Sequence, residues 1–172
     1  MKLPGLIVAI ASGFVVCHAQ AQSFPAKPIR LIVSAAAAGS LDIPARAIAE
    51  RLRDRLPLIV ENQPAAGGTI AVGNVAKAAP DGYTLIYGFN GPLAYAPFLF
   101  SKLAYDPLKD LTPVILMGGQ PFTLGVTASL GVNSVKELVE LLRKNPGKYN
   151  YASLSNGSGS HLSMELLKNM TK

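Results

Sequence analysis

The chain has 172 residues, a formal charge of +6 and a single cysteine, and almost half of its residues are apolar. Its basic residues are scattered and no aromatic stacking surface accompanies them, which argues against a nucleic-acid-binding protein. The positive excess would suit an acidic small ligand instead. The roughly 150 residues after the N-terminal segment are enough for an ordinary apolar core.

The N-terminal segment has the pattern of an export signal. Lys2 supplies a positive charge, residues 3–16 are mainly apolar, and Ala19-Gln20-Ala21 ends the run with a small-x-small pattern. We therefore predict a signal peptide over residues 1–21, cleaved after Ala21, and a periplasmic location. A lipoprotein anchor at Cys17 is the alternative, which the bulky residue before the cysteine disfavours. Cleavage after Ala21 would leave a charge of +5 and no cysteine, and so no disulfide.

Residues 22–100 alternate between apolar β-branched runs and helical patterns. Strands are expected at 29–33, 58–60 and 83–87, and helices at 42–56 and 69–79. Short connections between alternating strands and helices predict a parallel sheet covered by helices. Asp42 is interpreted as the N-cap of the first helix. Such sheets bind ligands at the carboxyl ends of their strands, which places the loops 34–41 and 88–92 at a binding edge.

Residues 101–113 are expected to be an irregular crossing into a second unit, residues 114–172. That unit should contain strands at 114–117, 122–127 and 149–153 and helices at 135–145 and 160–170, with Ser134 starting the first helix. Three strands per unit are fewer than the usual 5 or 6 of a sheet. Both units therefore resemble halves, and we expect the chain to be a fragment, a truncated product or an incomplete sequence.

The segment 150–162 is rich in glycine and serine and joins the last expected strand to the last expected helix. Glycines permit close approach, and a helix N-terminus carries partial positive charge, so this composition suits the binding of an anionic small molecule. The alternative is a plain connection in which Ser160 caps the helix.

Several motifs in order resemble one family. They are Pro25-x-Lys27-Pro28-Ile29-Arg30-Leu31-Ile32-Val33, Asp42-Ile43-x-Ala45-Arg46, Val60-Glu61-Asn62-x-Pro64-x-Ala66-Gly67-Gly68, Ala79-Pro80-Asp81-Gly82-Tyr83-Thr84-Leu85 and Tyr105-Asp106-Pro107-x-Lys109-Asp110. With the segment 150–162, they resemble the N-terminal half of the extracytoplasmic solute receptors of tripartite tricarboxylate transporters, Bordetella type. The resemblance implies a two-lobed, periplasmic-binding-protein-like α/β fold, each lobe a mainly parallel sheet flanked by helices. It also implies a monomer that closes on a dicarboxylate, a tricarboxylate or an acidic amino acid and presents it to the membrane subunits of a transporter.

The resemblance and the loop positions together imply ligand contacts on two walls. The first wall would comprise Gly39, Ser40, Asp42, Asn90 and Gly91, and the second Ser153, Gly157, Ser158 and His161. No metal or cofactor is expected, because His161 is the one histidine left after signal cleavage and no cysteine remains. No enzyme is expected either, since the sequence around Ser158 is not the Gly-x-Ser-x-Gly nucleophile elbow. An exported serine hydrolase using Ser158 and His161, and a truncated receptor without function, are the alternatives.

Three positions depart from the family pattern. Ala38 and Ser155 stand where the family favours glycine, and Leu41 where it favours threonine. Loss of the threonine hydroxyl would remove a ligand hydrogen bond worth about 1 kcal/mol. Ala38 is tolerable unless its position requires a positive φ, where a Cβ is penalised.

Overall fold

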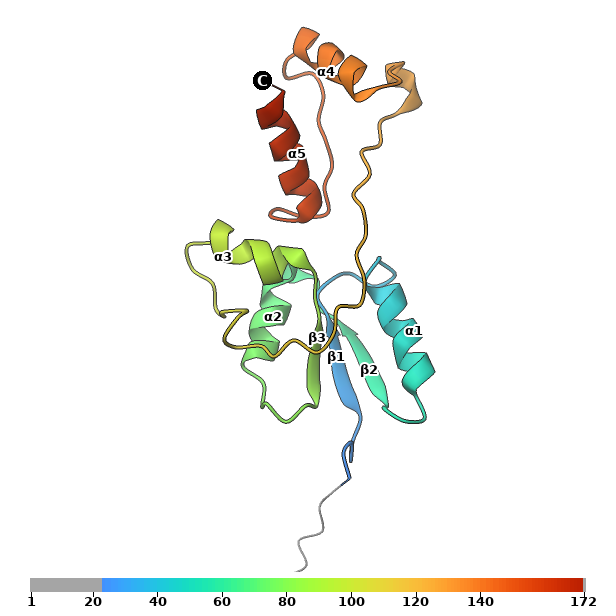
Figure 1. The fold of residues 1–172 in the computed structure, drawn as a ribbon, viewed down its shortest axis with the longest axis vertical. Coiled ribbons are helices and arrows are strands. Elements are labelled where there is room, and N and C mark those ends of the chain that lie inside the picture. The colour runs from blue at the N-terminus through green and yellow to red at the C-terminus, as the bar shows by residue number, and fades with distance from the viewer. Residues whose placement is uncertain (1–22, 172) are drawn as a thin grey trace, which may run out of the picture.

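The computed structural model describes residues 23–171, which form a lower unit around a sheet and an upper unit of helices (Figure 1). The predicted signal peptide 1–21, with Cys17, lies outside the described residues. Within the described range no helix combines the length and apolar character needed to cross a membrane.

The lower unit is built on three parallel strands, as the alternation of elements predicts. They are β1 (Ile29–Val33), β2 (Leu58–Asn62) and β3 (Thr84–Tyr87), in the order β2-β1-β3. Leu31 of β1 pairs with Val60 on one side and with Leu85 on the other. The central strand buries successive residues, as expected for a strand covered on both faces.

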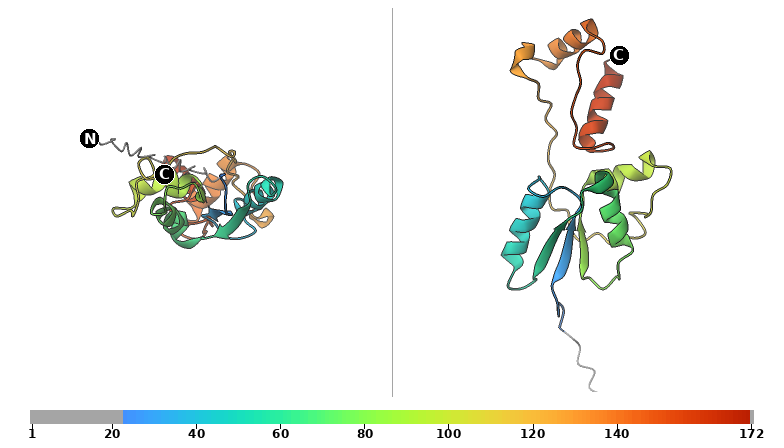
Figure 2. Two further views of the ribbon diagram at one scale, coloured as in Figure 1. Left: turned by 90° about the horizontal axis from the view of Figure 1, so that it is seen from below. Right: turned by 180° about the vertical axis from the view of Figure 1, so that it is seen from behind.

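Two helices flank this sheet. α1 (Asp42–Leu52) packs against β1 and β2, and α2 (Thr69–Ala76) packs against β1 and β3 (Figure 2). Leu31, Val33 and Ala45 form the centre of the core between β1 and α1. Both helices end earlier than predicted, α1 at Leu52 and not at residue 56. Residues 53–55 continue as turns, and Pro57 disfavours helical geometry in the residue before it.

The chain after β3 is more regular than predicted. A π-helical turn, η2 (Gly91–Tyr95), continues into a short helix, α3 (Ala96–Leu99), in a stretch where no helix is predicted. Tyr105 is buried, and its hydroxyl donates a 2.6 Å hydrogen bond to the Pro92 carbonyl. Burial raises the pKa of this hydroxyl, so it stays a donor. This bond fixes the end of the lower unit against the turn that follows β3.

The upper unit consists of a short turn, η3 (Ala128–Leu130), and two helices, α4 (Val135–Lys144) and α5 (Gly159–Met170). Ser134 caps α4 as predicted: its hydroxyl accepts from the Glu137 N–H at 3.1 Å, and the Glu137 carboxylate accepts from the Asn133 N–H. The Arg143 guanidinium donates to the Thr171 carbonyl at 2.7 Å and 3.0 Å, which ties α4 to the end of α5.

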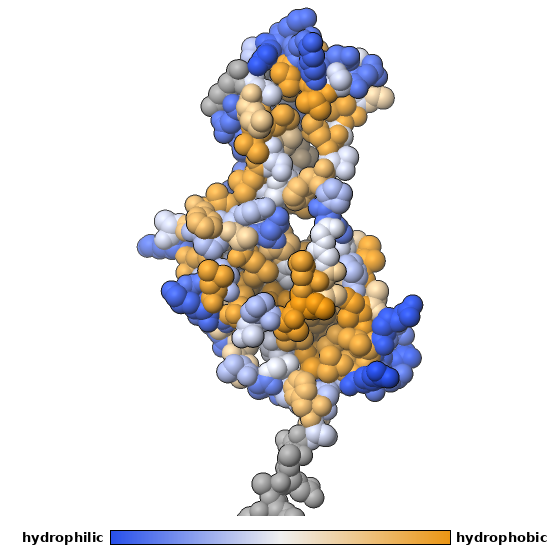
Figure 3. Space-filling model, in the orientation of Figure 1, coloured by the Kyte–Doolittle hydropathy of each residue, from blue (hydrophilic) through white to orange (hydrophobic). Residues whose placement is uncertain are grey.

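The strands predicted at 114–117, 122–127 and 149–153 are wrong, since within residues 23–171 these segments form no strand and the upper unit contains no sheet. A strand requires a neighbour that accepts and donates its backbone hydrogen bonds, and none lies beside these segments within the described chain. Residues 112–129 are all exposed. Apolar side chains consequently show on the surface over the lower unit and along the connection to the upper one (Figure 3).

Candidate ligand-binding site

The loops after the three strands meet at the carboxyl edge of the sheet. A Cβ built on Gly68 would lie 3.0 Å from the carbonyl oxygen of Ser34 and 3.1 Å from the Pro92 ring. Gly68 also has a φ of 88°, so glycine is required there both for space and for backbone conformation. Ser34 is buried, and its hydroxyl donates to the Tyr87 carbonyl at 3.3 Å. Ser34 was not among the predicted site residues. The Gly67-Gly68 pair before α2 was the sequence signal that the loops of Ser34 and Pro92 approach this turn closely.

The loop between β1 and α1 is organised by a buried carboxylate. Asp42 is 2% exposed and accepts hydrogen bonds from the Ala38 N–H at 2.7 Å, Arg46 Nε at 3.0 Å and Asn62 Nδ2 at 2.9 Å. The bond from Arg46, followed by that from Ala38, lowers the pKa of Asp42 to about 2. The predicted N-cap role is wrong, because Leu41 occupies the N-cap and Asp42 is the first helical residue. Its carboxylate accepts from the loop and from the Arg46 side chain, and not from a backbone N–H of the first turn of α1.

Of the two other predicted residues of this loop, Gly39 is half-buried and Ser40 lies at the surface. Gly39 donates its N–H to the Ala36 carbonyl at 3.3 Å. Ala38 has a φ of 61°. This is the left-handed conformation, in which the Cβ of an alanine is penalised, so alanine in place of the family's glycine carries a conformational cost here.

The opposite wall is the loop that starts α5. Ser158 is the N-cap: it is 1% exposed, and its hydroxyl accepts from the His161 N–H at 3.3 Å. Ser160 therefore does not cap the helix; its hydroxyl lies 3.0 Å from that of Ser158. Gly157 precedes the cap with a φ of 75°. Ser153 is exposed at the start of the loop.

His161 is held in one orientation. Its Nδ1 accepts the Gly157 N–H at 3.2 Å, so a neutral ring carries its proton on Nε2. The ring also stacks on Tyr151, with centroids 6.4 Å apart and planes 21° from parallel. His161 and Gly157 line a cavity of about 110 Å³ together with Leu99, Phe100 and Asn156. This volume is below the roughly 300 Å³ at which typical ligand pockets start, so the cavity suits one small group.

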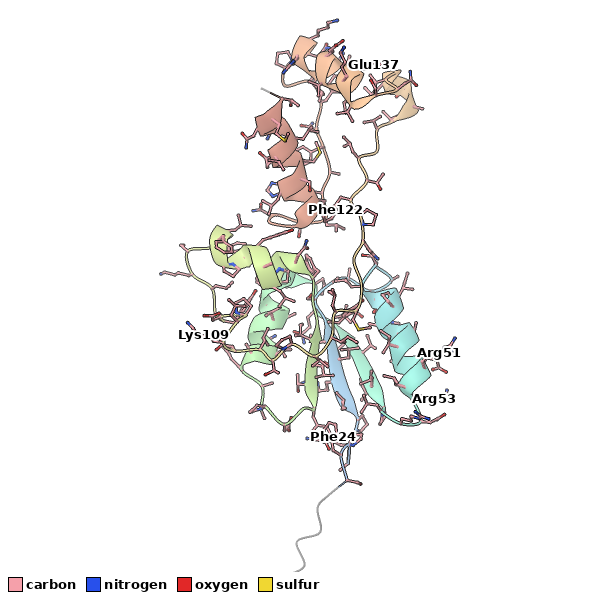
Figure 4. The ribbon with its side chains drawn as sticks, in the orientation of Figure 1. Phe24, Arg51, Arg53, Lys109, Phe122 and Glu137 are labelled. Atoms are coloured by element: carbon pink, nitrogen blue, oxygen red, sulfur yellow. The ribbon has the colours of Figure 1, made fainter. Side chains whose placement is uncertain are left out.

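The α5 loop lies against the lower unit. A Cβ on Gly67 would be 3.4 Å from the Asn156 carbonyl, and a Cβ on Gly159 would be 3.2 Å from Asn90 Nδ2. A Cβ on Gly159 would also collide with the ring of Phe122, which Figure 4 shows between the N-terminal end of α5 and the connecting segment. The structure thus brings Asn90 together with the residues that start α5. The hydroxyls of Ser40 and Ser153 make no hydrogen bond to another part of the described chain.

Three helices begin at the junction where the α5 loop meets the carboxyl edge of the sheet. The N-termini of α1 and α2 lie at the carboxyl edge of the sheet, and the N-terminus of α5 points down toward the same edge (Figure 1). Each helix N-terminus carries partial positive charge. Asp42 offsets this charge at α1, whereas α2 and α5 have no acidic residue in their first turns. The N-termini of α2 and α5 therefore favour an anion where they meet. Residues 23–171 contain no group of three or more potential metal ligands.

Comparison with known proteins identifies relatives of this arrangement. Residues 44–171 match the model of the tripartite tricarboxylate transporter family receptor. BugT of Bordetella pertussis is 35% identical over 164 residues, which cover 94% of this chain and 50% of BugT. The Cupriavidus necator UPF0065 protein of the gbd 5′ region is 40% identical over 152 residues, covering 87% of this chain and 46% of that protein. The chain thus spans about half the length of these relatives.

Solved structures show the same fold. Rpa4515 of R. palustris with adipate superposes with a TM-score of 0.81 at 38% identity, over 86% of this chain and 50% of that one. MatC of Rhodopseudomonas palustris with bound malate gives a TM-score of 0.78 at 36% identity, over 86% of this chain and 51% of that one. The fold is therefore the α/β fold of periplasmic binding proteins, as the sequence motifs imply.

Proposed function

Because this chain belongs to the family of tripartite tricarboxylate transporter receptors, we propose that it binds a small carboxylate as part of an extracytoplasmic solute receptor. The proposal includes a periplasmic location, delivery of the ligand to the membrane subunits of a transporter, and no catalysis. Adipate and malate in the two structural relatives favour a dicarboxylate.

The observation that carries the proposal is the placement of the α5 N-terminus opposite Asn90. Gly159 approaches the Asn90 amide closely, and neither α5 nor α2 carries an acidic residue in its first turn. A carboxylate between the units would gain backbone donors and the field of two helix N-termini. His161 Nε2–H would add one donor beside the 110 Å³ cavity.

The proposed contacts follow from this geometry, with water bridging the longer distances. The lower wall would comprise Gly39, Ser40, Asn90 and Gly91, and the upper wall Ser153, Gly157, Ser158 and His161. Asp42, also predicted as a contact, has three protein donors, which supports a place behind the wall and not in it.

Thermal melting of residues 22–172 with adipate, malate, citrate and glutamate tests the proposal, with adipamide as the uncharged control. A ligand at one hundred times its Kd stabilises the folded state by about 2.7 kcal/mol. We expect adipate or malate to raise Tm and adipamide to leave it unchanged. If no carboxylate raises Tm, the proposed function is wrong for this chain. That result is the one expected for a truncated receptor without function.

A His161→Phe variant separates ligand contact from loop structure. It keeps the ring beside Tyr151 but removes Nε2–H together with the Nδ1 acceptor of the Gly157 N–H, and we expect affinity for the carboxylate to fall at least tenfold, about the value of one hydrogen bond to a charged group. His161→Asn, whose amide oxygen can replace Nδ1 as that acceptor, should lose as much affinity if Nε2–H contacts the ligand. Tyr151→Phe is the matched control, since it keeps the stacked rings and removes only the hydroxyl that donates to Glu165 at 2.6 Å. Equal losses in both variants would argue against a contact from His161.

The geometry disfavours the serine hydrolase. The Ser158 hydroxyl is buried as the cap of α5, and His161 Nδ1 accepts from Gly157 and not from Ser158. A nucleophile needs a base within hydrogen-bond reach and an exposed oxygen. Turnover of a generic ester that Ser158→Ala abolishes would overturn the receptor proposal.

A further inference from the structure

The Asp42 side chain connects three segments of the lower unit. Its carboxylate joins the Ala38 N–H of the loop after β1, Arg46 on α1 and Asn62 at the end of β2. Asn62 closes the network, since its Nδ2 donates to the Ala35 carbonyl at 3.1 Å and its Oδ1 accepts from Arg46 Nη2 at 2.9 Å. The same pair, Asp42 and Asn62, therefore holds both ends of the segment 35–38.

That segment needs an external restraint. Ala38 has a φ of 61°, which an alanine avoids because its Cβ crowds the following carbonyl. Ala38 is also exposed, so no packing compensates. The short bond from its N–H to Asp42, at 2.7 Å, is the interaction that opposes relaxation to a negative φ.

We propose that Asp42 is a positioning residue that holds Ala38 in the left-handed conformation and so keeps Gly39 and Ser40 at the carboxyl edge of β1. Asp42 then acts on the ligand through the loop and does not touch it. Only this last step rests on the proposed function, since the restraint on Ala38 is a property of the free protein.

A double-mutant cycle of Asp42→Ala and Ala38→Gly tests the restraint. Asp42→Ala should lower Tm and speed amide exchange of residues 35–40 on the order of tenfold, as loss of a charge-assisted bond implies. Ala38→Gly removes the conformational penalty, so we expect it to raise Tm and to cut the Tm loss from Asp42→Ala by at least half. If Asp42 matters only through its ion pair with Arg46, the loss will be the same in both backgrounds, which would overturn the proposal.

Asp81→Ala is the matched control. Asp81 also accepts a backbone N–H, from Tyr83 at 3.0 Å, and also faces a cation, Lys27 at 3.9 Å, but it lies at the other end of the sheet. Its effect on Tm should not depend on residue 38. If Asp42→Ala fails to fold, Asp42→Glu displaces the oxygens while keeping the charge, and the same cycle with Ala38→Gly decides the question.

Adipate binding adds an independent result. Asp42→Ala should weaken binding about tenfold, and Ala38→Gly in the same chain should restore most of it. A loss that Ala38→Gly does not restore would make Asp42 a direct contact and overturn the positioning role. If the wild-type chain binds no dicarboxylate, the proposed function fails while the melting cycle still decides the restraint.

Discussion

Asp42 makes the stability of the lower unit depend on pH. Its pKa is about 2 in the folded chain, against an ordinary value of 3.8, because bonds from Arg46 and Ala38 outweigh burial. The unfolded chain therefore binds more protons between these values. The stabilisation is fully present above about pH 4 and is lost as pH falls toward 2.

This predicts that the Tm of the wild-type chain falls more steeply between pH 5 and pH 2.5 than that of Asp42→Asn. The pKa of Glu61 and that of Glu165 are lowered as well, by Arg30 and Lys168 respectively, but both groups are present in the two proteins and cancel in the difference. Thermal melts across this range measure the effect. Parallel curves would show that the network does not store a charge-dependent stabilisation.

Besides Ala38, Ala66 in the turn before α2 is a described non-glycine residue with a positive φ, 50°. Ala66→Gly should stabilise the chain by about 0.5–1 kcal/mol, because the left-handed conformation costs glycine little. Ala65→Gly is the neighbouring control, and since Ala65 is not among the positive-φ residues we expect a loss of similar size from the freer unfolded chain. Urea unfolding of both variants measures the difference, and equal effects would contradict it.

At the scale of elements, the contact between the α5 loop and the lower unit can be tested with two glycines. Gly157 and Gly147 both have a φ of 75°, so alanine incurs the same backbone penalty at each. A Cβ on Gly157 would lie 3.0 Å from Leu99 of α3, whereas Gly147 has open space. We expect Gly157→Ala to lower Tm by several degrees more than Gly147→Ala and to weaken carboxylate binding. Equal losses would mean that the α5 loop does not rest on α3 in solution.

Elements whose partners are close in sequence could be predicted from the sequence. Residues 29–33 form β1 as expected, because the apolar run and its two parallel neighbours occur within 60 residues. Residues 122–127 carry an equally good strand pattern but form no strand, since pairing depends on a neighbour that the pattern cannot specify.

The same distinction holds within the site. The helix predicted over 160–170 is confirmed as α5, which begins one residue earlier, at Gly159, and has its cap at Ser158 and not at Ser160. The direction of the Asp42 side chain could not be predicted. An aspartate before a helix ordinarily caps it, and only the fold brings Asn62 and the Ala38 N–H within reach. The ligand contacts themselves stay a prediction.

At the scale of the whole molecule, the connection between the units is exposed and uncharged. Residues 111–135 contain no charged side chain, and Val114 and Leu116 are 78% and 89% exposed. Phe122, Leu124 and Val126 alternate along the chain, so an extended backbone places them on one face. A segment with unpaired backbone groups, apolar side chains and no charge is a template for strand pairing between molecules.

We therefore expect this chain, although its family resemblance implies a monomer, to aggregate as its concentration rises. Leu124→Lys should suppress the aggregation, because a charge at the centre of the alternating face must be desolvated for two such segments to pair. Leu108→Lys is the control: Leu108 is 91% exposed but lies outside residues 111–135, so the added charge alone should have a smaller effect. Static light scattering at several concentrations distinguishes the variants. Equal suppression by both would assign the effect to net charge and not to pairing of this segment.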